Sequence, residues 1–341
     1  MSDAATPAPR ERGWRRLLPA LAAFLLLPAL PLVSMAVPIP ESLPLLVTAL
    51  AACTLLGWWS GGRASLALVW CALAGWVVVQ PGLSHSPHDW MARGWALLAA
   101  GAFGVVSLVA GARPFFGRAL AAVALAGALA GALVLASPSG PGRVRRIVRT
   151  EVERRVAAEV ESQRASRAEL EQTGVLRRYP SLKATLEQGE ERIAAATASV
   201  AVVYPALLAL ESLAALALAW SLYHRVSRAR IGPPLAPLRD FRFSDQLVWG
   251  LIVGITVLVL PSLRGIHALG LNLLVFFGAL YALRGLGVLA WFLNPTRPVA
   301  GLLVGVALFL LLQDRAAFAL GLVGVGDTWL DWRSRPRSTS T

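Results

Sequence analysis

Two ionisable side chains lie within long apolar stretches of this sequence, where a charge is costly. Glu211 lies in the middle of the run Ile193–Tyr223, and Arg284 lies in the run His267–Phe292. Such groups usually face the interior of a helical bundle, where they pair, line a cavity or meet a ligand. We therefore expect one of three arrangements: a charge pair that fixes helix register, a site for a small molecule or a proton, or two unrelated groups that reach water.

Polar uncharged residues in the same stretches support an interior polar region. Asn272 lies in the run with Arg284, and Gln313 interrupts the last apolar run together with Asp314 and Arg315. Amide side chains form hydrogen bonds between membrane helices that contribute about 0.6 kcal/mol on average. We expect Asn272 to line or brace the same cavity as Glu211 and Arg284. The Asp314-Arg315 pair is more typical of a water interface or a helix break.

The last polar motif combines indoles with charges. Its residues are Asp327, Trp329, Asp331, Trp332 and Arg333. Indoles prefer the depth of the lipid headgroups, and the carboxylates can accept hydrogen bonds from loop amides or from Arg333. The motif is expected to anchor the tail at the membrane surface, with docking of a partner such as an energising subunit as the alternative.

No residue pattern indicates catalysis or a cofactor. His85, His88 and Asp89 are too few, and too interrupted by Pro87, to predict a metal site. The chain has no Walker motif, dinucleotide fingerprint, nucleophile elbow or HExxH sequence. We therefore expect no enzyme activity, no cofactor and no bound metal.

The elements that position these residues are apolar segments long enough for a bilayer, whose core of roughly 30 Å needs about 20 residues per helix. The chain is 56% hydrophobic, with a mean hydropathy of +0.62. We predict an all-α polytopic bundle of about 8–10 transmembrane helices with a charged extramembrane helical insertion. The apolar runs are Leu17–Val37, Ser42–Trp59, Ala64–Gln80, Gly94–Ala112, Leu120–Ala136, Ile193–Tyr223, Gln246–Leu263, His267–Phe292 and Pro298–Val325.

The net charge of +13 reflects topology signals rather than nucleic-acid binding, because the arginines lie in short loops beside apolar runs. With the N-terminus in the cytoplasm, 13 arginines face the cytoplasm and 5 face outward. The cytoplasmic set is Arg10, Arg12, Arg15, Arg16, Arg63, Arg113, Arg118, Arg225, Arg228, Arg230, Arg239, Arg242 and Arg297, and the outer set is Arg93, Arg264, Arg333, Arg335 and Arg337. This bias predicts a multi-pass protein whose N-terminus is cytoplasmic. The heavy use of Arg, Ala, Gly and Leu indicates a GC-rich bacterial genome, so we expect the protein in the bacterial cytoplasmic membrane.

Two ends of the chain leave alternatives open. The first run is either an uncleaved helix kinked at Pro19, Pro28 and Pro31 or a signal peptide cleaved near Ser34-Met35-Ala36. The last run, residues 298–325, is either one long span or two short helices. Two short helices would return the tail to the cytoplasm.

A charged block divides the chain into three segments, 1–136, 137–192 and 193–341. Between Arg143 and Arg192 it carries 12 basic and 9 acidic residues. Val144, Val148, Val152, Val156 and Val160 recur every four residues, which predicts a helix with one apolar stripe. Glu151 and Arg155 are spaced for an ion pair on that helix. A second, short helix should start near Ser181. We expect a hairpin on the membrane or the bundle, with partner binding or gating, and disorder, as alternatives.

Pairs of glycines four residues apart predict close helix packing, because a residue without Cβ lets backbones approach. These pairs are Gly127/Gly131, Gly250/Gly254 and Gly301/Gly305.

The order of several motifs resembles one family. They are Tyr204–Ser212, the basic Pro-rich stretch Pro233–Arg242, Leu247–Gly250, Leu271–Leu274, Tyr281–Leu286 and the closing Gly326–Arg333. In this order they resemble the YybS-like family of predicted bacterial membrane proteins, most clearly from about residue 195 onward. The family is similar to the substrate-binding subunits of energy-coupling-factor vitamin transporters. The resemblance implies a compact helical bundle able to hold a small molecule, and it assigns no role to Glu211 or Arg284.

Two functions therefore stand at this point. The favoured one is a small-molecule binding or transport component without an ATPase of its own. The alternative is a structural or interaction protein of the cell envelope whose contact surface is residues 143–192. The first predicts a polar cavity near Glu211 and Arg284, and the second predicts an exposed apolar stripe on the valine helix. Lipid is a partner in both cases.

Overall fold

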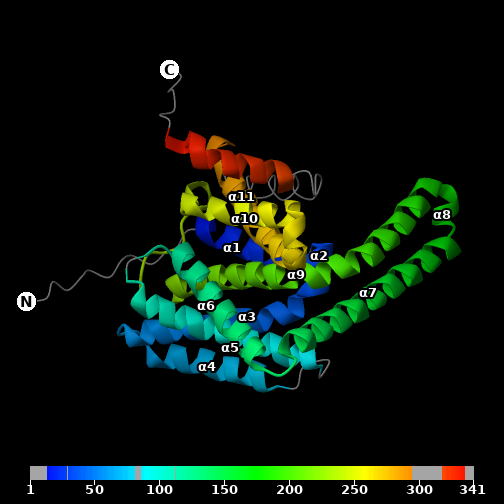
Figure 1. The fold of residues 1–341 in the computed structure, drawn as a ribbon. Helices are drawn as coiled ribbons and strands as arrows, with labels where there is room; N and C mark the ends of the chain where they lie inside the picture. The colour runs from blue at the N-terminus through cyan, green and yellow to red at the C-terminus, as the bar shows by residue number, and fades with distance from the viewer. Residues whose placement is uncertain (1–13, 29, 81–85, 112, 294–316, 335–341) are drawn as a thin grey trace, which may run out of the picture.

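The computed structural model describes residues 14–28, 30–80, 86–111, 113–293 and 317–334. Throughout these ranges the chain folds into α-helices joined by turns and by one longer loop, residues 227–247, with no strand (Figure 1). The all-α prediction is confirmed. The helices are α1 (Trp14–Leu26), α2 (Pro31–Ala36), α3 (Ile39–Trp59), α4 (Ala64–Val79), α5 (Pro87–Val109), α6 (Phe115–Ala136), α7 (Gly140–Gln172), α8 (Val175–Arg178), α9 (Pro180–Val226), α10 (Val248–Val259) and α11 (His267–Leu293), followed by a C-terminal helix, Ala317–Leu330.

Within the described residues, each predicted apolar run overlaps an apolar helix, but the helices differ in length. By length and composition, 5 described helices can cross a membrane: Pro40–Trp59, Pro87–Val109, Phe115–Ala136, Ala198–Val226 and Pro261–Phe292. The shorter apolar helices are Leu17–Leu26, Ala64–Val79, Asp245–Val259 and Ala317–Leu330. The protein is therefore a polytopic membrane protein.

The first apolar run is broken as its prolines predict. Helix α1 carries Pro19 inside it and ends at Leu26, and α2 begins at Pro31. Proline lacks a backbone N–H and clashes with the preceding turn, so it ends a helix or opens a new one. The break bends the chain so that α2 leads into the first turn of α3.

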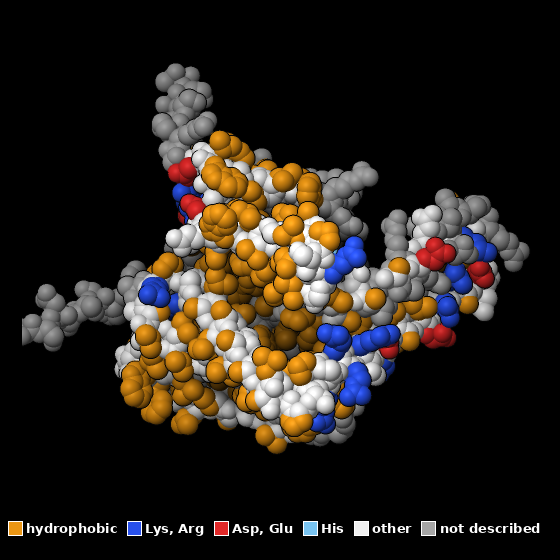
Figure 2. Space-filling view, in the orientation of Figure 1, with side chains coloured by type: hydrophobic (Ala, Val, Ile, Leu, Met, Phe, Trp, Pro, Cys, Tyr) orange, Lys and Arg blue, Asp and Glu red, His pale blue; other side chains and the backbone are white. Residues whose placement is uncertain are grey.

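Hydrophobic side chains cover much of the face of the bundle that Figure 2 shows. Large side chains such as Trp59, Val79, Val109 and Leu135 are more than three-quarters exposed. Contiguous exposed apolar surface on this scale is typical of contact with lipid rather than water.

The longest helix, α9, is continuous over 47 residues from Pro180 to Val226. The predicted short helix near Ser181 begins where expected but does not end, so that prediction of its length is wrong. The only helix-weakening residue before the bundle is Gly189, which costs about 1 kcal/mol relative to alanine. The predicted boundary at residue 192 thus falls inside one helix.

Helix α7 and the first half of α9 form a hairpin, closed by α8, that projects from the bundle (Figure 1). Near the bundle, Val148, Val152 and Val156 are buried against α2 and against Val200 and Tyr204 of α9. The predicted valine helix is confirmed. Its apolar stripe is covered rather than exposed, because α2 and α9 pack on it.

At the opposite end of the bundle, the loop 227–247 is fastened to the helix ends. The Trp220 indole donates to the Pro233 carbonyl at 3.1 Å, and the Tyr223 hydroxyl donates to the Ala229 carbonyl at 3.1 Å. The buried Arg118 guanidinium lies over the Trp220 ring and fills the space beside Gly232, whose φ of +71° favours glycine.

The tail returns to this same face. Arg333 donates to the carbonyls of Arg239 at 3.1 Å and Phe241 at 2.9 Å. This placement agrees with the alternative that brings the tail back to the side of the 227–247 loop. Whether residues 298–325 form two helices falls partly outside the described residues.

Close helix contacts occur at some of the predicted glycines. Gly254 of α10 meets the backbone of Gly270 in α11, whereas Gly127 and Gly131 have open space beside them. Gly301 and Gly305 lie outside the described residues. The closest approach is one that the GxxxG pattern missed: a Cβ on Gly285 would lie 1.9 Å from the Leu320 carbonyl oxygen. Glycine here lets α11 cross the C-terminal helix directly.

Candidate functional site

Two polar clusters occupy opposite ends of the bundle. We call the first, beside the α7–α9 hairpin, the hairpin-side cluster; it consists of Glu41, His88, Glu151, Arg154 and Arg155. We call the second, beside the 227–247 loop, the loop-side cluster; it consists of Asp245, Arg284, Asp327 and Arg333. Glu211 lies on α9, the helix that runs from one end to the other.

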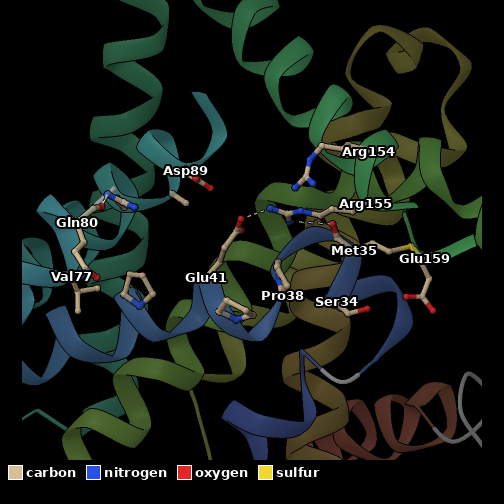
Figure 3. A pocket seen from close by; sticks show the side chains of 14 residues that line it. Ser34, Met35, Pro38, Glu41, Val77, Gln80, Asp89, Arg154, Arg155 and Glu159 are labelled. Carbon is tan, nitrogen blue, oxygen red and sulfur yellow. Dashed lines mark hydrogen bonds and ion pairs between the residues drawn. The ribbon is translucent and has the colours of Figure 1, made fainter. Parts of the chain in front are cut away.

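The hairpin-side cluster is organised around Arg155 of α7 (Figure 3). Its Nε donates to Glu151 Oε1 at 2.8 Å, and its Nη2 contacts Glu41 Oε1. Its Nη1 donates to the Ala36 carbonyl at 2.7 Å and the Met35 carbonyl at 3.3 Å. One guanidinium therefore joins α7 to the end of α2 and the start of α3. The predicted Glu151–Arg155 pair is confirmed.

Helix ends place these groups where their charges are favourable. The carbonyls of Met35 and Ala36 belong to the last turn of α2, where a cation can satisfy them. Glu41 lies in the first turn of α3, where the helix dipole favours a carboxylate. At the α2–α3 junction, the C-terminal end of α2 therefore binds a guanidinium, and the N-terminal end of α3 holds a carboxylate.

Glu151 is held ionised by two arginines of its own helix. Arg154 donates to its two oxygens at 2.5 and 3.1 Å. These bonds, with the positive charge of Arg155, lower the pKa of Glu151 to about 2 against the burial that opposes them. Glu151 therefore acts as a fixed negative charge beneath the two guanidinium groups.

His88 completes the cluster from α5. Ser86 caps this helix by accepting from the Asp89 amide at 3.2 Å, which sets His88 in the first turn. The buried His88 Nδ1 lies 3.4 Å from Glu41 Oε1 and 3.4 Å from Arg155 Nη2, and its ring packs edge-on against Tyr204.

The geometry of these residues does not suit a metal ion. Glu41, His88 and Asp89 offer ligand atoms within 4.8 Å of one another. The Arg155 guanidinium, however, lies against both Glu41 and His88, so a cation would have to displace a positive charge already bound there. His85 lies outside the described residues.

A cavity of about 600 Å³ opens beside this cluster (Figure 3). Helices α3, α5 and α7 supply most of its walls. Charged side chains of both signs line it: Arg93, Arg154 and Arg155, and Glu41, Asp89 and Glu159. Its volume lies within the roughly 300–1,000 Å³ typical of small-molecule sites.

Arg93 is fixed on the wall away from α7. Its Nη1 donates to the Val78 carbonyl at 2.9 Å and contacts the Gln80 carbonyl, at the end of α4. The guanidinium also lies over the Trp90 ring at 5.5 Å. In these contacts Arg93 bonds neutral carbonyls, so its positive charge is available to a ligand.

Glu211 is the most completely buried carboxyl of the described chain, with an exposed fraction of 0%. Neither of its oxygens makes a hydrogen bond of ordinary geometry among the described residues. The nearest polar neighbour is the buried hydroxyl of Ser42, the residue after Glu41. Glu211 does not line the cavity itself; its neighbour Ser42 lies on α3, the helix that also carries the lining residue Glu41.

Arg284 does not pair with Glu211. Its Nε donates to Asp327 Oδ2 at 2.9 Å and its Nη1 donates to Asp245 Oδ1 at 2.8 Å. Arg333 adds a bond of 2.6 Å to Asp327. Arg284 lies two-thirds of the way along α11, near the 227–247 loop, whereas Glu211 lies deeper along α9. The sequence could place both residues in apolar runs but not at the same depth.

Asn272 braces α9 rather than lining the cavity. Its Oδ1 accepts from the Ala206 amide at 2.9 Å, and its Nδ2 donates to the Val202 carbonyl at 2.8 Å. These two backbone groups flank Pro205 within α9. A neighbouring side chain that satisfies backbone groups near a proline makes that proline tolerable inside a membrane helix.

The C-terminal motif divides into buried and exposed parts. Asp327 and Arg333 are buried in the loop-side cluster. Trp329 is two-thirds exposed, Trp332 packs on Gly326, and Asp331 pairs with Arg242 at 2.8 Å. The arrangement anchors the tail on the loop.

The sequence interpretation missed Glu41 and the role of Arg155 in joining helices. One signal was present: Glu41 is the only acidic residue between Glu11 and Asp89. An isolated carboxylate in the first turn of an apolar helix is a candidate for a buried ion pair. Its partner, 114 residues away, carries no comparable signal.

The comparison with known families agrees with the fold. The model of a family described as predicted membrane protein (DUF2232) matches residues 97–328, which is more than half of the chain. No curated protein and no solved structure matches it. The similarity to energy-coupling-factor subunits stays a prediction. With its bundle of apolar helices and its matched motifs, the chain belongs to the DUF2232 family of predicted membrane proteins, as the resemblance to YybS-like proteins indicated.

Proposed function

We propose that this protein binds a small charged molecule in the hairpin-side cavity and acts as a binding or transport component of the bacterial cytoplasmic membrane. The observation that carries this proposal is the cavity of about 600 Å³ with fixed charges of both signs on its walls. Three of them, Arg93, Arg155 and Glu41, are largely buried, and burying charges is costly for a purely structural protein. A site that orients a polar ligand gives them a use.

The charges favour a ligand that is itself dipolar. Arg93 offers a positive charge on one wall, and Arg154 and Arg155 offer positive charges on another. Glu41, Asp89 and Glu159 supply the negative charges. A molecule with a carboxylate or phosphate at one end and an amine at the other would find a partner for each group.

Glu211 is the group that would link binding to a proton. An ionised carboxylate is costly at a site with no exposure and, among the described residues, no hydrogen bond of ordinary geometry. We propose that Glu211 carries a proton in the empty protein and exchanges it through Ser42 towards the cavity. This assigns Glu211 to coupling and leaves the first contact with ligand to the cavity walls.

The orientation follows from the arginine bias. The 227–247 loop faces the cytoplasm in this proposal, together with Arg63, Arg113 and Arg118. The hairpin and the cavity then face outward, which suits uptake or sensing of an external solute. Because the sequence holds no nucleotide-binding motif, energy for transport would come from an ion gradient or a partner subunit.

Native mass spectrometry of the protein purified in mild detergent tests this function. We expect a small molecule to co-purify with the wild-type protein and to be lost from Arg155→Gln. Arg149→Gln is the matched control, because Arg149 forms an exposed pair with Glu153 on the same helix. Equal retention by both variants, or no retained molecule after incubation with dipolar metabolites, would reject the proposal.

An envelope interaction protein is the second candidate. It is favoured by the hairpin, whose far end projects from the bundle with exposed polar side chains (Figure 1). Cross-linking in cells from Arg178→Cys at the hairpin tip, compared with Ser244→Cys at an exposed position of the 227–247 loop, would test it. A specific stoichiometric partner captured only from the tip would favour this candidate.

A further inference from the structure

A second feature of the molecule is an apolar hollow on the lipid-facing side of the bundle (Figure 2). Helices α6 and α11 each pack on α9 but make no substantial contact with one another among the described residues. The hollow therefore has α9 as its floor and the other two helices as its walls. It is distinct from the hairpin-side cavity, which α3, α5 and α7 line.

The side chains along these helices are apolar and partly exposed. Val202 of α9 is 38% exposed, Leu271 of α11 is 37% exposed and Leu133 of α6 is 66% exposed. Pro205, one turn beyond Val202, is also exposed. Such a surface fits acyl chains better than it fits water or a polar solute.

Unbalanced positive charge lies at the hairpin end of this hollow. Arg143, Arg145 and Arg146 are exposed at the start of α7, a few residues after α6 ends at Ala136. The segment from Trp90 to Thr150 contains no acidic residue. The first carboxylate of α7, Glu151, is already bound by Arg154 and Arg155.

A further arginine lies on the opposite wall. Arg264 is exposed in the short turn between α10 and α11. In Figure 2, basic side chains lie both over the start of α7 and at the turn between α10 and α11, on either side of the hollow. Both positions follow or precede apolar helices directly, which places them at headgroup depth.

The geometry points to a binding site for an anionic phospholipid of the hairpin-side leaflet. The arginines at the start of α7, with Arg264, bind the phosphate, and the acyl chains lie in the hollow over Val202 and Pro205. Charge complementarity selects the occupant: a zwitterionic lipid fills the same hollow but leaves the arginines without a net counter-charge. The site does not depend on the proposed function of the cavity.

The pairing of chains with headgroup gives the site two separable requirements. Arginines alone would bind any phosphate, and the hollow alone would bind any lipid. Only a molecule with both parts satisfies the whole site, so the deacylated headgroup should bind poorly.

Native mass spectrometry of the full chain with equal amounts of phosphatidylglycerol and phosphatidylcholine tests the site. We expect the wild-type protein to retain phosphatidylglycerol preferentially, and R145Q/R146Q to lose that preference roughly tenfold. The matched control is R178Q/K183Q, which removes two charges from the far part of the hairpin. Circular dichroism of both variants checks that each retains its helices.

Three results would overturn this inference. Equal retention of the two lipids by the wild-type protein would remove the role of charge. An unchanged preference in R145Q/R146Q would place the lipid elsewhere. Equally strong binding of glycerophosphoglycerol, the headgroup without acyl chains, would show that the hollow contributes nothing.

Discussion

The two polar clusters use the same chemistry at opposite ends of the bundle and differ in access to solvent. In each, an arginine on one helix bonds carboxylates from two other positions in the chain. The Arg284 and Asp327 side chains at the centre of the loop-side cluster are 4% and 0% exposed, and Asp245 is 64% exposed at its edge. Arg155 and Glu41, at the centre of the hairpin-side cluster, are 12% and 17% exposed and border a cavity. A buried ion pair alone therefore does not indicate a binding site. What indicates a binding site is a cavity beside the ion pair.

The largest expected effect comes from breaking the buried Arg284–Asp327 ion pair of the loop-side cluster. Asp327→Asn leaves the Arg284 and Arg333 guanidinium groups without their shared carboxylate, and breaking such a pair costs about 3–5 kcal/mol. We expect a large loss of thermal stability in detergent. Intrinsic tryptophan fluorescence, recorded as the temperature rises, measures that loss. The contrasting variant is Asp331→Asn, which breaks an exposed pair with Arg242 and should cost at most about 1 kcal/mol.

Equal stability of Asp327→Asn and Asp331→Asn would contradict the structural role of the loop-side cluster. It would mean that the tail contributes no more through Asp327 than through a surface contact.

At Arg155 we expect a smaller loss of stability but a complete loss of ligand binding. Arg155→Gln removes the charge that joins Glu151, Glu41 and the end of α2, at a cost of about 2 kcal/mol in this partly open site. Thermal unfolding measures that cost, and ligand retention measures the binding. A variant that loses stability and keeps its ligand would make the hairpin-side cluster structural, like its counterpart.

Asn272 offers an intermediate test that concerns neither cluster. Asn272→Leu leaves the Val202 carbonyl and the Ala206 amide without their bridging partner, which we expect to cost about 1–2 kcal/mol. Thr256→Val is the control, because the Thr256 hydroxyl bonds only within its own helix, to the Ile252 carbonyl. An equal effect of the two substitutions would show that the bridge at Pro205 is dispensable.

The last test concerns how stability changes with pH, and it depends on Glu151. Its pKa in the folded protein, about 2, is lower than its ordinary value of 4.5, so the folded state favours the ionised carboxylate. This contribution to stability is fully present above about pH 4.5 and is lost as the pH falls towards 2. We expect Glu151→Gln to be less stable than wild type at pH 7, with the difference shrinking between pH 4.5 and 2. A constant difference across that window would contradict the ion-pair geometry.

The amino-acid pattern predicted the apolar helices well because hydrophobicity over about 20 residues is a local property. Where the prediction failed, the sequence lacked information about how the helices lie relative to one another. Nothing local shows that α9 continues through residue 192, that Arg284 lies at the depth of Asp327 rather than of Glu211, or that Arg155 reaches the α2–α3 junction. Each depends on how far one helix is shifted along another.

In the candidate site, too, the sequence identified residues by type, whereas their roles depend on which residues surround them in the fold. Glu211 and Asn272 were identified from their residue types in apolar runs, but their different roles follow from their neighbours: Ser42 beside the first, and the backbone around Pro205 beside the second. The valine stripe predicted the α7 helix, while only packing shows that α2 and α9 cover it.

An experimental structure of the protein, purified gently and imaged by cryo-electron microscopy, tests the central claim most directly. The account predicts non-protein density in the hairpin-side cavity, between the Arg154–Arg155 wall and Arg93, and none in the loop-side cluster. A cavity closed by direct contact of Arg93 with Glu41 or Glu159, with no space left for a ligand, would contradict it.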